Sequence, residues 1–332
     1  MRVLFWGTPE FAVPTLRALT EEGHQVVGVV TQPDRPAGRG RKLQPSPVKV
    51  AAEEDGIPVL TPEKPVGDAF LEQLRALDPE VSVVAAYGHI LRPEVLELPP
   101  HGSWNVHASL LPELRGAAPI HWAIARGHDA TGVSIMRMAK GMDAGPVLHQ
   151  VVEPIGEHET SSELTERLAE TGAQALIEAL ALLEYGEAEP VEQDHARATY
   201  APKVSRAVAR VDWTRPAREV ADLIRAMDAH PGAWTEWQGE PLKLFRPATE
   251  VPEGWEAPVR ADAGPGAGPG GADSAPAPGT ILVADPAVPG ALAVQAGDGP
   301  VWIGEVQPPG KRRMPVQDWL RGHGAEAGQE VR

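Results

Sequence analysis

Short apolar runs alternate with amphipathic stretches through the first half of the chain. The runs are rich in Val, Leu and Ile and are apolar at consecutive positions, which is typical of strands that are buried on both faces. They lie at residues 3–6, 26–30, 81–85, 104–107 and 133–136. Because helix candidates lie between most of them, the pattern predicts an α/β fold with a doubly wound, mostly parallel sheet. Such sheets bind ligands beyond the carboxyl ends of their strands.

The second half of the chain carries a different pattern. A capping signal at 160–163 predicts the start of a helix with regular apolar spacing. We expect this helix to be the last element of a first domain that comprises residues 1–185. Residues 186–206 are polar and predict a linker. In the second domain, 207–332, a helix after Pro216 is followed by short strand candidates. They lie at 233–237, 242–245, 280–283, 291–294 and 301–303, and together they predict a small β-barrel.

One segment of the second domain, residues 261–279, cannot contribute to a core. It contains six Gly and four Pro in 19 residues. Collagen would place Gly at every third position, and this segment does not. It therefore predicts a flexible surface excursion between two strands of the barrel.

Composition narrows the class of protein. The chain has 332 residues, of which 42% are hydrophobic, and it contains no cysteine, so it can hold no disulfide, thiolate metal site or catalytic thiol. No apolar run reaches membrane-spanning length, and we expect a cytoplasmic protein with no membrane partner. No grouping of His, Asp and Glu has the spacing of a metal site, so we expect no metal.

Charge is distributed unevenly along the chain. The formal net charge of −16 argues against a general nucleic-acid binder. Between residues 31 and 50, however, five Lys and Arg residues stand against one Asp, which gives a local charge of +4. Arg39, Arg41 and Lys42 lie in this stretch beside two glycines. A basic loop on an acidic protein is a candidate for RNA contact at one place, and a solvated charged loop is the alternative.

Asn105 and His107 are the first candidates for catalysis. Both belong to a predicted strand, where the side chains of residues i and i+2 point to the same face. An amide that can donate to an oxyanion, beside an imidazole that can move a proton, suits attack on a carbonyl. Asp143, held in a loop between Gly141 and Gly145, can orient the imidazole. This set predicts acyl transfer to an amine, and a structural Asn–His pair is the alternative.

Longer strings around these residues carry a resemblance. The order Asn-x-His-x-Ser-Leu-Leu-Pro at 105–112, Arg-Gly-Ala-Ala-Pro-Ile at 115–120 and Met-Asp-Ala-Gly-Pro at 142–146 resembles the folate-dependent formyltransferase family. The resemblance extends over nearly the whole chain, through further strings at 7–12, 32–40, 198–203 and 310–314. One departure is Glu113-Leu114, where the family commonly has an aromatic and a basic residue.

The resemblance implies an N-terminal domain that binds formyl-folate and a C-terminal barrel similar to an OB fold. It also implies 10-formyltetrahydrofolate as donor and the α-amino group of methionyl initiator tRNA as acceptor, and we expect a monomer. The residues on the family's catalytic positions are Asn105, His107 and Asp143. Those expected to contact folate are Ile90, Ser109, Leu110, Leu111 and Pro112. Those expected to contact tRNA are Arg39, Arg41 and Lys42.

Three other functions remain open. A folate-dependent formyltransferase could act on a small amine, such as a purine precursor or an amino sugar, but the barrel and the basic loop would then have no obvious role. An RNA-binding module without activity would not need Asn105, His107 and Asp143 together. A dehydrogenase of similar topology would need a glycine fingerprint, and the turn at 7–12 lacks the three glycines.

Overall fold

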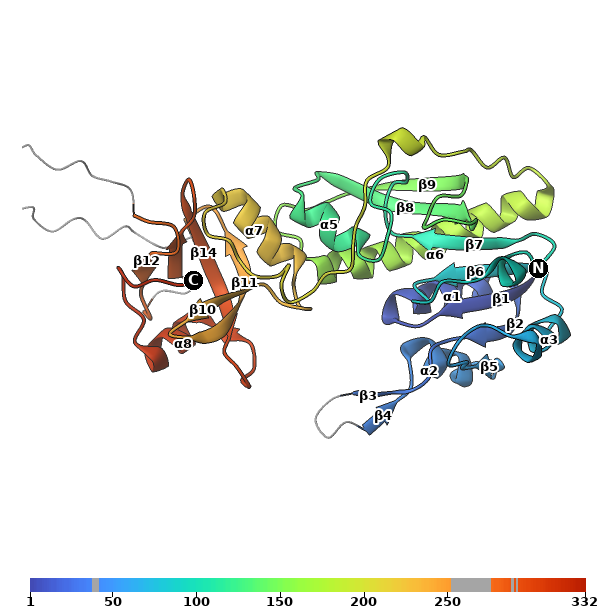
Figure 1. The fold of residues 1–332 in the computed structure, drawn as a ribbon, viewed down its shortest axis with the longest axis horizontal. Helices are drawn as coiled ribbons and strands as arrows, with labels where there is room; N and C mark the ends of the chain where they lie inside the picture. Colours follow the sequence, from blue (N-terminus) through green and yellow to red (C-terminus); the bar gives the residue numbers. More distant parts are fainter. Residues whose placement is uncertain (38–41, 252–275, 288–289, 291) are drawn as a thin grey trace, which may run out of the picture. The chain divides into compact units, whose positions relative to one another are not determined.

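The chain folds into two compact units, shown in Figure 1. The computed structural model describes residues 1–37, 42–251, 276–287, 290 and 292–332. Unit 1 comprises Met1–Ala123, Asp129–Ile155 and Ser162–Lys203, and unit 2 comprises Ile124–His128, Gly156–Ser161 and Val204–Arg332. Residues 186–203 therefore belong to unit 1. Most of the predicted surface excursion, residues 261–275, lies outside the described residues.

Unit 1 is built on a seven-stranded sheet with the order β5-β2-β1-β6-β7-β8-β9. The strands are β1 (Arg2–Gly7), β2 (Gln25–Val30), β5 (Val59–Leu60), β6 (Val81–Ala85), β7 (Ser103–His107), β8 (Ala130–Arg137) and β9 (Val147–Pro154). The strands from β5 to β7 in this order are parallel, whereas β8 and β9 each pair antiparallel with their neighbour. The prediction of a mostly parallel α/β sheet is confirmed.

The antiparallel edge of the sheet was not predicted. β9 lies at that edge, where half-buried residues alternate with exposed ones over most of its length. It therefore has no continuous apolar run of the kind that marked the interior strands. The direction of β8 could not be predicted either, because the apolar pattern of a buried strand is the same whether the strand runs parallel or antiparallel to its neighbour.

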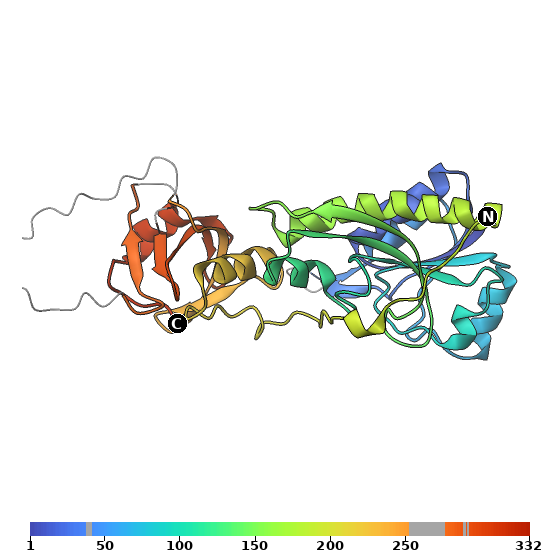
Figure 2. The ribbon, with the colours of Figure 1, turned by 90° about the horizontal axis from the view of Figure 1, so that it is seen from above.

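Helices cover both faces of the sheet (Figure 2). The helices up to residue 203 are η1 (Glu10–Ala12), α1 (Val13–Glu21), α2 (Pro47–Glu54), α3 (Asp68–Ala76), α4 (Pro93–Leu96), α5 (Pro119–Ala125), α6 (Ser161–Tyr185) and η2 (His195–Arg197). Side chains of α3 and α4 share a buried cluster with Trp6 and Val84 on one face. On the opposite face α6 passes close to β7, since a Cβ at Gly172 would lie 2.8 Å from the Val106 side chain. Within the described residues, no helix combines the length and apolar character needed to cross a membrane.

Unit 2 contains an antiparallel sheet in the order β10-β11-β14-β13-β12, with β15 paired to β14. The strands are β10 (Trp234–Trp237), β11 (Glu240–Ala248), β12 (Ile281–Ala284), β13 (Leu292–Gln295), β14 (Pro300–Gln307) and β15 (Met314–Pro315). The five predicted strands are confirmed, and the curled sheet agrees with an OB-like domain. The helix α8 (Val316–His323) was not predicted, because its eight residues repeat the apolar spacing too few times.

The helix α7 (Ala217–Ala226) begins after Pro216, as predicted, and buries Val220 and Ile224. Its buried face also contains an ion pair, in which Arg225 Nη2 donates to Asp222 Oδ1 at 2.6 Å. Both side chains are less than 6% exposed. Removal of the Asp222 carboxylate would leave the buried guanidinium of Arg225 without its charged partner, which is more damaging than the loss of an exposed pair.

Asp222→Ala should therefore lower the stability of unit 2 by on the order of 3 kcal/mol. The matched control is Glu219→Ala on the same helix, which removes the exposed pair with Arg215 and should cost about 1 kcal/mol or less. Urea unfolding followed by tryptophan fluorescence would measure both. Equal effects of the two substitutions would contradict the assignment.

Candidate active site

Three alternate residues of β7 point to one face of the sheet. Ser103, Asn105 and His107 are separated by two positions each, and the register places Asn105 beside Val84 of β6. That face is the one covered by α3 and α4. Asn105 is 8% exposed, and its side-chain amide makes no hydrogen bond with any residue that the structure describes. The amide is therefore available to a ligand.

The imidazole of His107 is held at one nitrogen and faces a carboxylate with the other. Its Nε2 lies 3.1 Å from the carbonyl oxygen of Leu114, which can only accept, so Nε2 carries a proton. Its Nδ1 lies 3.8 Å from Asp143 Oδ2. That separation is too long for a hydrogen bond but allows a proton to pass with a small movement or through one water molecule.

Asp143 reaches this position through an unusual backbone conformation. Its φ is +48°, in the left-handed region that residues with a Cβ rarely occupy. The Gly116 N–H donates to Asp143 Oδ2 at 2.8 Å, which fixes the carboxylate. Gly116 is itself restricted, because its φ is +121° and a Cβ there would lie 2.7 Å from the carbonyl oxygen of Ala201. The predicted set of Asn105, His107 and Asp143 thus comes from β7 and the loop after β8, and the Gly116 N–H joins that loop to the one after β7.

The string predicted to contact folate closes the end of β7. Ser134 Oγ of β8 donates to the Ser109 carbonyl at 2.6 Å and accepts from the Leu111 N–H at 3.0 Å. Gln150 Nε2 of β9 donates to the Leu111 carbonyl at 3.0 Å. Ser109 and Leu111 are buried, whereas Leu110 and Pro112 are half-buried. The string therefore has a structural role that is independent of any ligand.

Ile90 lies apart from that string, on the loop between β6 and α4. It is 90% exposed, so it is free to contact a ligand. The loop is anchored by Tyr87, whose ring packs edge-to-face on Trp6 with 5.2 Å between centroids. Burial raises the pKa of Tyr87 to about 12, so this phenol does not exchange protons near neutral pH.

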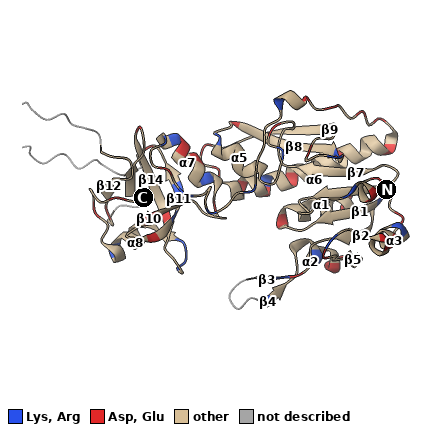
Figure 3. Ribbon diagram, viewed as in Figure 1, with Lys and Arg blue, Asp and Glu red and all other residues tan. Residues whose placement is uncertain are grey.

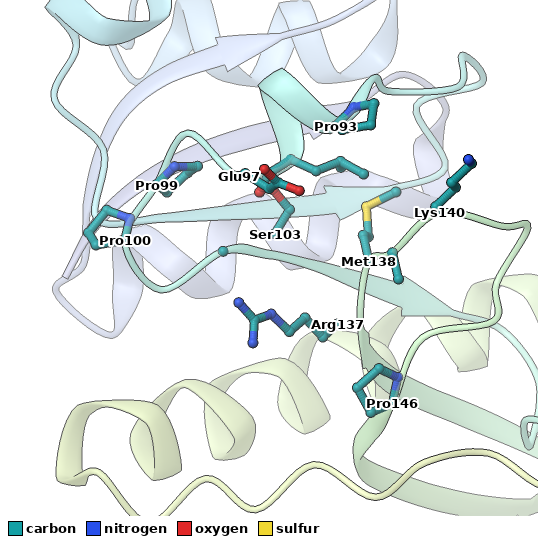
Figure 4. Close-up of a pocket in the computed structure, with 12 residues that line it drawn as sticks. Pro93, Glu97, Pro99, Pro100, Ser103, Arg137, Met138, Lys140 and Pro146 are labelled. Atoms are coloured by element: carbon teal, nitrogen blue, oxygen red, sulfur yellow. The ribbon is translucent and has the colours of Figure 1, made fainter.

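A pocket of about 540 Å³ lies beside the Asp143 loop. Its lining residues come from α4 and the segment after it, the start of β7 and the Asp143 loop: Pro93, Leu96, Glu97, Pro99, Pro100, Gly102, Ser103, Arg137, Met138, Ala139, Lys140 and Pro146. Figure 4 shows the Met138 side chain directed toward Pro93, and Lys140 directed away from the pocket. None of the residues predicted to contact folate lines it. Sequence reasoning missed this pocket, because its walls carry no recognisable motif.

The basic stretch forms a separate ribbon beside the sheet (Figure 1). Strands β3 (Arg35–Ala37) and β4 (Lys42–Gln44) pair antiparallel, with Ala37 opposite Lys42. Two residues predicted to contact tRNA, Arg39 and Arg41, lie outside the described residues, whereas Lys42 begins β4 and is exposed.

At the base of this ribbon, Lys49 Nζ donates to the Asp34 carboxylate at 2.9 Å. This bond raises the pKa of Lys49 and keeps it charged. Elsewhere, basic and acidic residues are interspersed over the described parts of both units (Figure 3). The described residues contain no group of three or more His, Asp or Glu side chains placed to hold a metal ion.

Comparison with known proteins agrees with this architecture. The family model for "Formyl transferase" matches residues 1–180, and the model for "Formyl transferase, C-terminal domain" matches residues 203–324. A methionyl-tRNA formyltransferase from Magnetococcus marinus is 42% identical over 99% of this chain and 98% of its own length. Further relatives with that name are 41% and 44% identical over nearly the whole chain.

Solved structures with the same fold are more distant in sequence. HypX from Aquifex aeolicus in complex with tetrahydrofolic acid gives a TM-score of 0.63 at 20% identity, over 96% of this chain and 47% of that larger one. The sugar 3N-formyl transferase WlaRD gives a TM-score of 0.63 at 15% identity, over 94% of this chain and 99% of that one. These two likenesses concern the fold alone. The full-length relatives and the two matched domains, by contrast, show that the chain belongs to the formyl transferase family and, within it, to the methionyl-tRNA formyltransferases.

Proposed function

We propose that this protein transfers the formyl group of 10-formyltetrahydrofolate to the α-amino group of methionyl initiator tRNA, with Asn105, His107 and Asp143 at the reacting centre. The observation that carries the proposal is the approach of His107 to Asp143, with Asn105 two residues away on the same face of β7, in a chain that aligns with methionyl-tRNA formyltransferases over nearly its whole length. No side-chain nucleophile is required, because the acceptor amine attacks the formyl carbon itself.

In the proposed reaction the neutral amine forms a C–N bond to the formyl carbon, and the bond from that carbon to N10 of the folate then breaks. An α-amino group has a pKa of about 8, so a useful fraction is neutral at pH 7. The amine loses one proton and N10 gains one, which leaves tetrahydrofolate and the formylated amine. The free amide of Asn105 donates to the oxyanion of the tetrahedral intermediate.

His107 and Asp143 together serve the proton transfers. Because the Leu114 carbonyl occupies Nε2, the nitrogen left for exchange is Nδ1, which faces Asp143. The proton of the attacking amine passes to this His107–Asp143 pair as the C–N bond forms. The pair returns a proton to N10 as the bond from N10 to the formyl carbon breaks, so both side chains end the reaction in their starting state.

The pocket beside the Asp143 loop is the site we assign to the pterin ring of the donor. Ser103 lines the pocket, and Asn105 is the next residue on the same face of β7, about 7 Å further along the strand. A pterin ring in the pocket would therefore place the formyl group near the Asn105 amide. The volume is within the usual range for small-molecule sites, and Leu96 and Met138 supply apolar walls.

A small amine acceptor is the second candidate, because a sugar formyl transferase shares the fold over nearly its whole length. We favour tRNA, since relatives above 40% identity carry the methionyl-tRNA name and the basic ribbon suits an RNA phosphate backbone.

The deciding experiment is a formylation assay with 10-formyltetrahydrofolate and aminoacylated initiator and elongator tRNAs. Transfer to an amino sugar or free methionine, with none to tRNA, would overturn the proposal.

Asn105→Ala and Asp143→Asn should each lower kcat on the order of a hundredfold or more, with little change in the KM of either substrate. Asn tolerates the left-handed conformation at position 143 and can still accept the Gly116 N–H bond, so this substitution removes charge without removing structure. His107→Ala should behave in the same way. Steady-state kinetics on folded protein would measure these effects, and near-normal turnover in any of the three would remove that residue from the mechanism.

Ala139→Trp should raise the KM for 10-formyltetrahydrofolate by on the order of tenfold, because an indole placed on the pocket wall competes with the pterin ring. The KM for tRNA should not change. Ala130→Trp, at the exposed first position of β8, is the matched control and should leave both constants unaltered. An unchanged donor KM in the Ala139 variant would place the pterin ring elsewhere.

Arg39→Ala should weaken use of tRNA without affecting folate binding, because the substitution removes charge from the basic loop and not from β7. If Arg39 contacts phosphates only, the substitution should lower the kcat/KM for initiator and elongator tRNAs by the same factor, and that factor should become smaller as the salt concentration rises. If it reads bases or shape, as we expect, discrimination between the two tRNAs should also fall. Kinetics at two salt concentrations would separate these outcomes, and unchanged rates would exclude the loop from recognition.

A further inference from the structure

Residues 191–201 lie across the two loops that form the active site. Val191 pairs with Val147, just after the Asp143 loop, and Tyr200 pairs with Arg115. The Arg115 N–H donates to the Thr199 carbonyl at 2.9 Å, and the Ala201 N–H donates to the Arg115 carbonyl at 2.7 Å. This segment, which we call the strap, is thus part of unit 1 and is hydrogen-bonded to the residue that precedes Gly116.

Gln193 is the buried side chain of the strap, with 8% exposure. Its Nε2 donates to the carbonyl oxygens of Asp143 at 2.9 Å and Gly145 at 2.6 Å. Its Oε1 accepts from Arg115 Nη2 at 2.6 Å and from Arg115 Nε at 3.1 Å. Only this orientation of the amide fits, because carbonyl oxygens cannot donate and a guanidinium cannot accept. The side-chain amide of Gln193 therefore uses all of its hydrogen bonds to link the Asp143 loop to Arg115.

Arg115 is a rigid anchor for this amide. It is 4% exposed, its backbone is paired with the strap on both sides, and Nη2 also donates to His195 Nδ1 at 2.9 Å. No carboxylate among the described residues forms an ion pair with it. Because Arg115 cannot move without breaking these contacts, the position of Gln193 Nε2 is fixed as well.

The Asp143 backbone needs such a restraint. Its left-handed φ of +48° is sparsely populated by residues with a Cβ, so the surrounding contacts must hold it. The Gly116 N–H holds the carboxylate, and Gln193 Nε2 holds the carbonyl of the same residue. Gly145 completes the turn against β8, where a Cβ would lie 1.9 Å from the Arg137 carbonyl oxygen.

We propose that Gln193 is a positioning residue for the formyl transfer, which holds Asp143 in the conformation that faces its carboxylate toward His107. Gln193 does not touch the substrate, and its effect on the reaction passes through Asp143. This inference rests on the proposed function and deepens it, because it adds a residue from the polar strap to the mechanism of the same site.

The test compares Gln193→Leu and Gln193→Glu in the wild-type and Asp143→Asn backgrounds, by single-turnover formyl transfer to methionyl-tRNA with enzyme in excess. Leu keeps the size but no hydrogen bonds, whereas Glu keeps the Arg115 contact and loses both donors to the loop. In the wild-type background both should slow transfer on the order of a hundredfold, with substrate KM values changed by less than about threefold. In the Asp143→Asn background they should change the rate by less than about twofold.

Glu192→Leu, at the exposed neighbouring position, is the matched control and should keep the wild-type rate. Equal losses in both backgrounds, or an active Gln193→Glu variant, would overturn the inference. If Gln193→Leu fails to fold, Gln193→Glu carries the same test.

Hydrogen–deuterium exchange supplies a readout that does not need activity. Residues 138–147 should exchange faster in the folded Gln193 variants, while β7 should stay protected. Unchanged exchange in that loop would also refute the inference. Absence of transfer by the wild-type protein would instead refute the proposed function, and the exchange result would still stand for or against the role of Gln193.

Discussion

The arrangement of the site depends on one hydrogen bond, from the Gly116 N–H to the carboxylate of Asp143. It joins the loop after β7 to the loop after β8, and the two bonded residues are 27 positions apart in the sequence. The bond has consequences on both sides. Gly116 must adopt a φ that only glycine adopts readily, and Asp143 must adopt a left-handed conformation that glycine or asparagine would adopt more easily. An aspartate nevertheless occupies this position, and its carboxylate faces the His107 imidazole.

The part of the site on β7 could be predicted from the sequence, and the reason is periodicity. Side chains on a strand alternate with a period of two, so Asn105 and His107 share a face wherever the strand lies. The apolar runs also located the interior strands of unit 1 and the barrel strands of unit 2, because burial on both faces leaves a continuous signal. Asp143 could be assigned only from the glycines around it and from the family resemblance, since no local pattern says which strand a loop will approach.

The strap could not be recognised in the same way. Residues 186–206 were predicted as a linker because they are polar and lack apolar spacing. Gln193, however, is buried by hydrogen bonds to backbone carbonyls and to Arg115, and a polar side chain buried in this manner leaves no hydrophobic period. The edge strand β9 was not predicted for a related reason, because its exposed residues interrupt the apolar run. Sequence periodicity detects surfaces that exclude water, and it is insensitive to polar groups that satisfy one another.

The charges of residues 31–50 are only partly paired with one another. The +4 of residues 31–50 includes Lys49, but Lys49 is paired with Asp34 at the base of the ribbon, so those two charges cancel locally. The remaining positive charge then belongs to Arg35, Arg39, Arg41 and Lys42, which are concentrated within eight residues of one another. In the proposed function, this concentration of positive charge in the sequence would attract a polyanion at one place on a chain with a net charge of −16. The negative net charge that argues against general nucleic-acid binding is thus consistent with the proposal that tRNA approaches the chain at these residues.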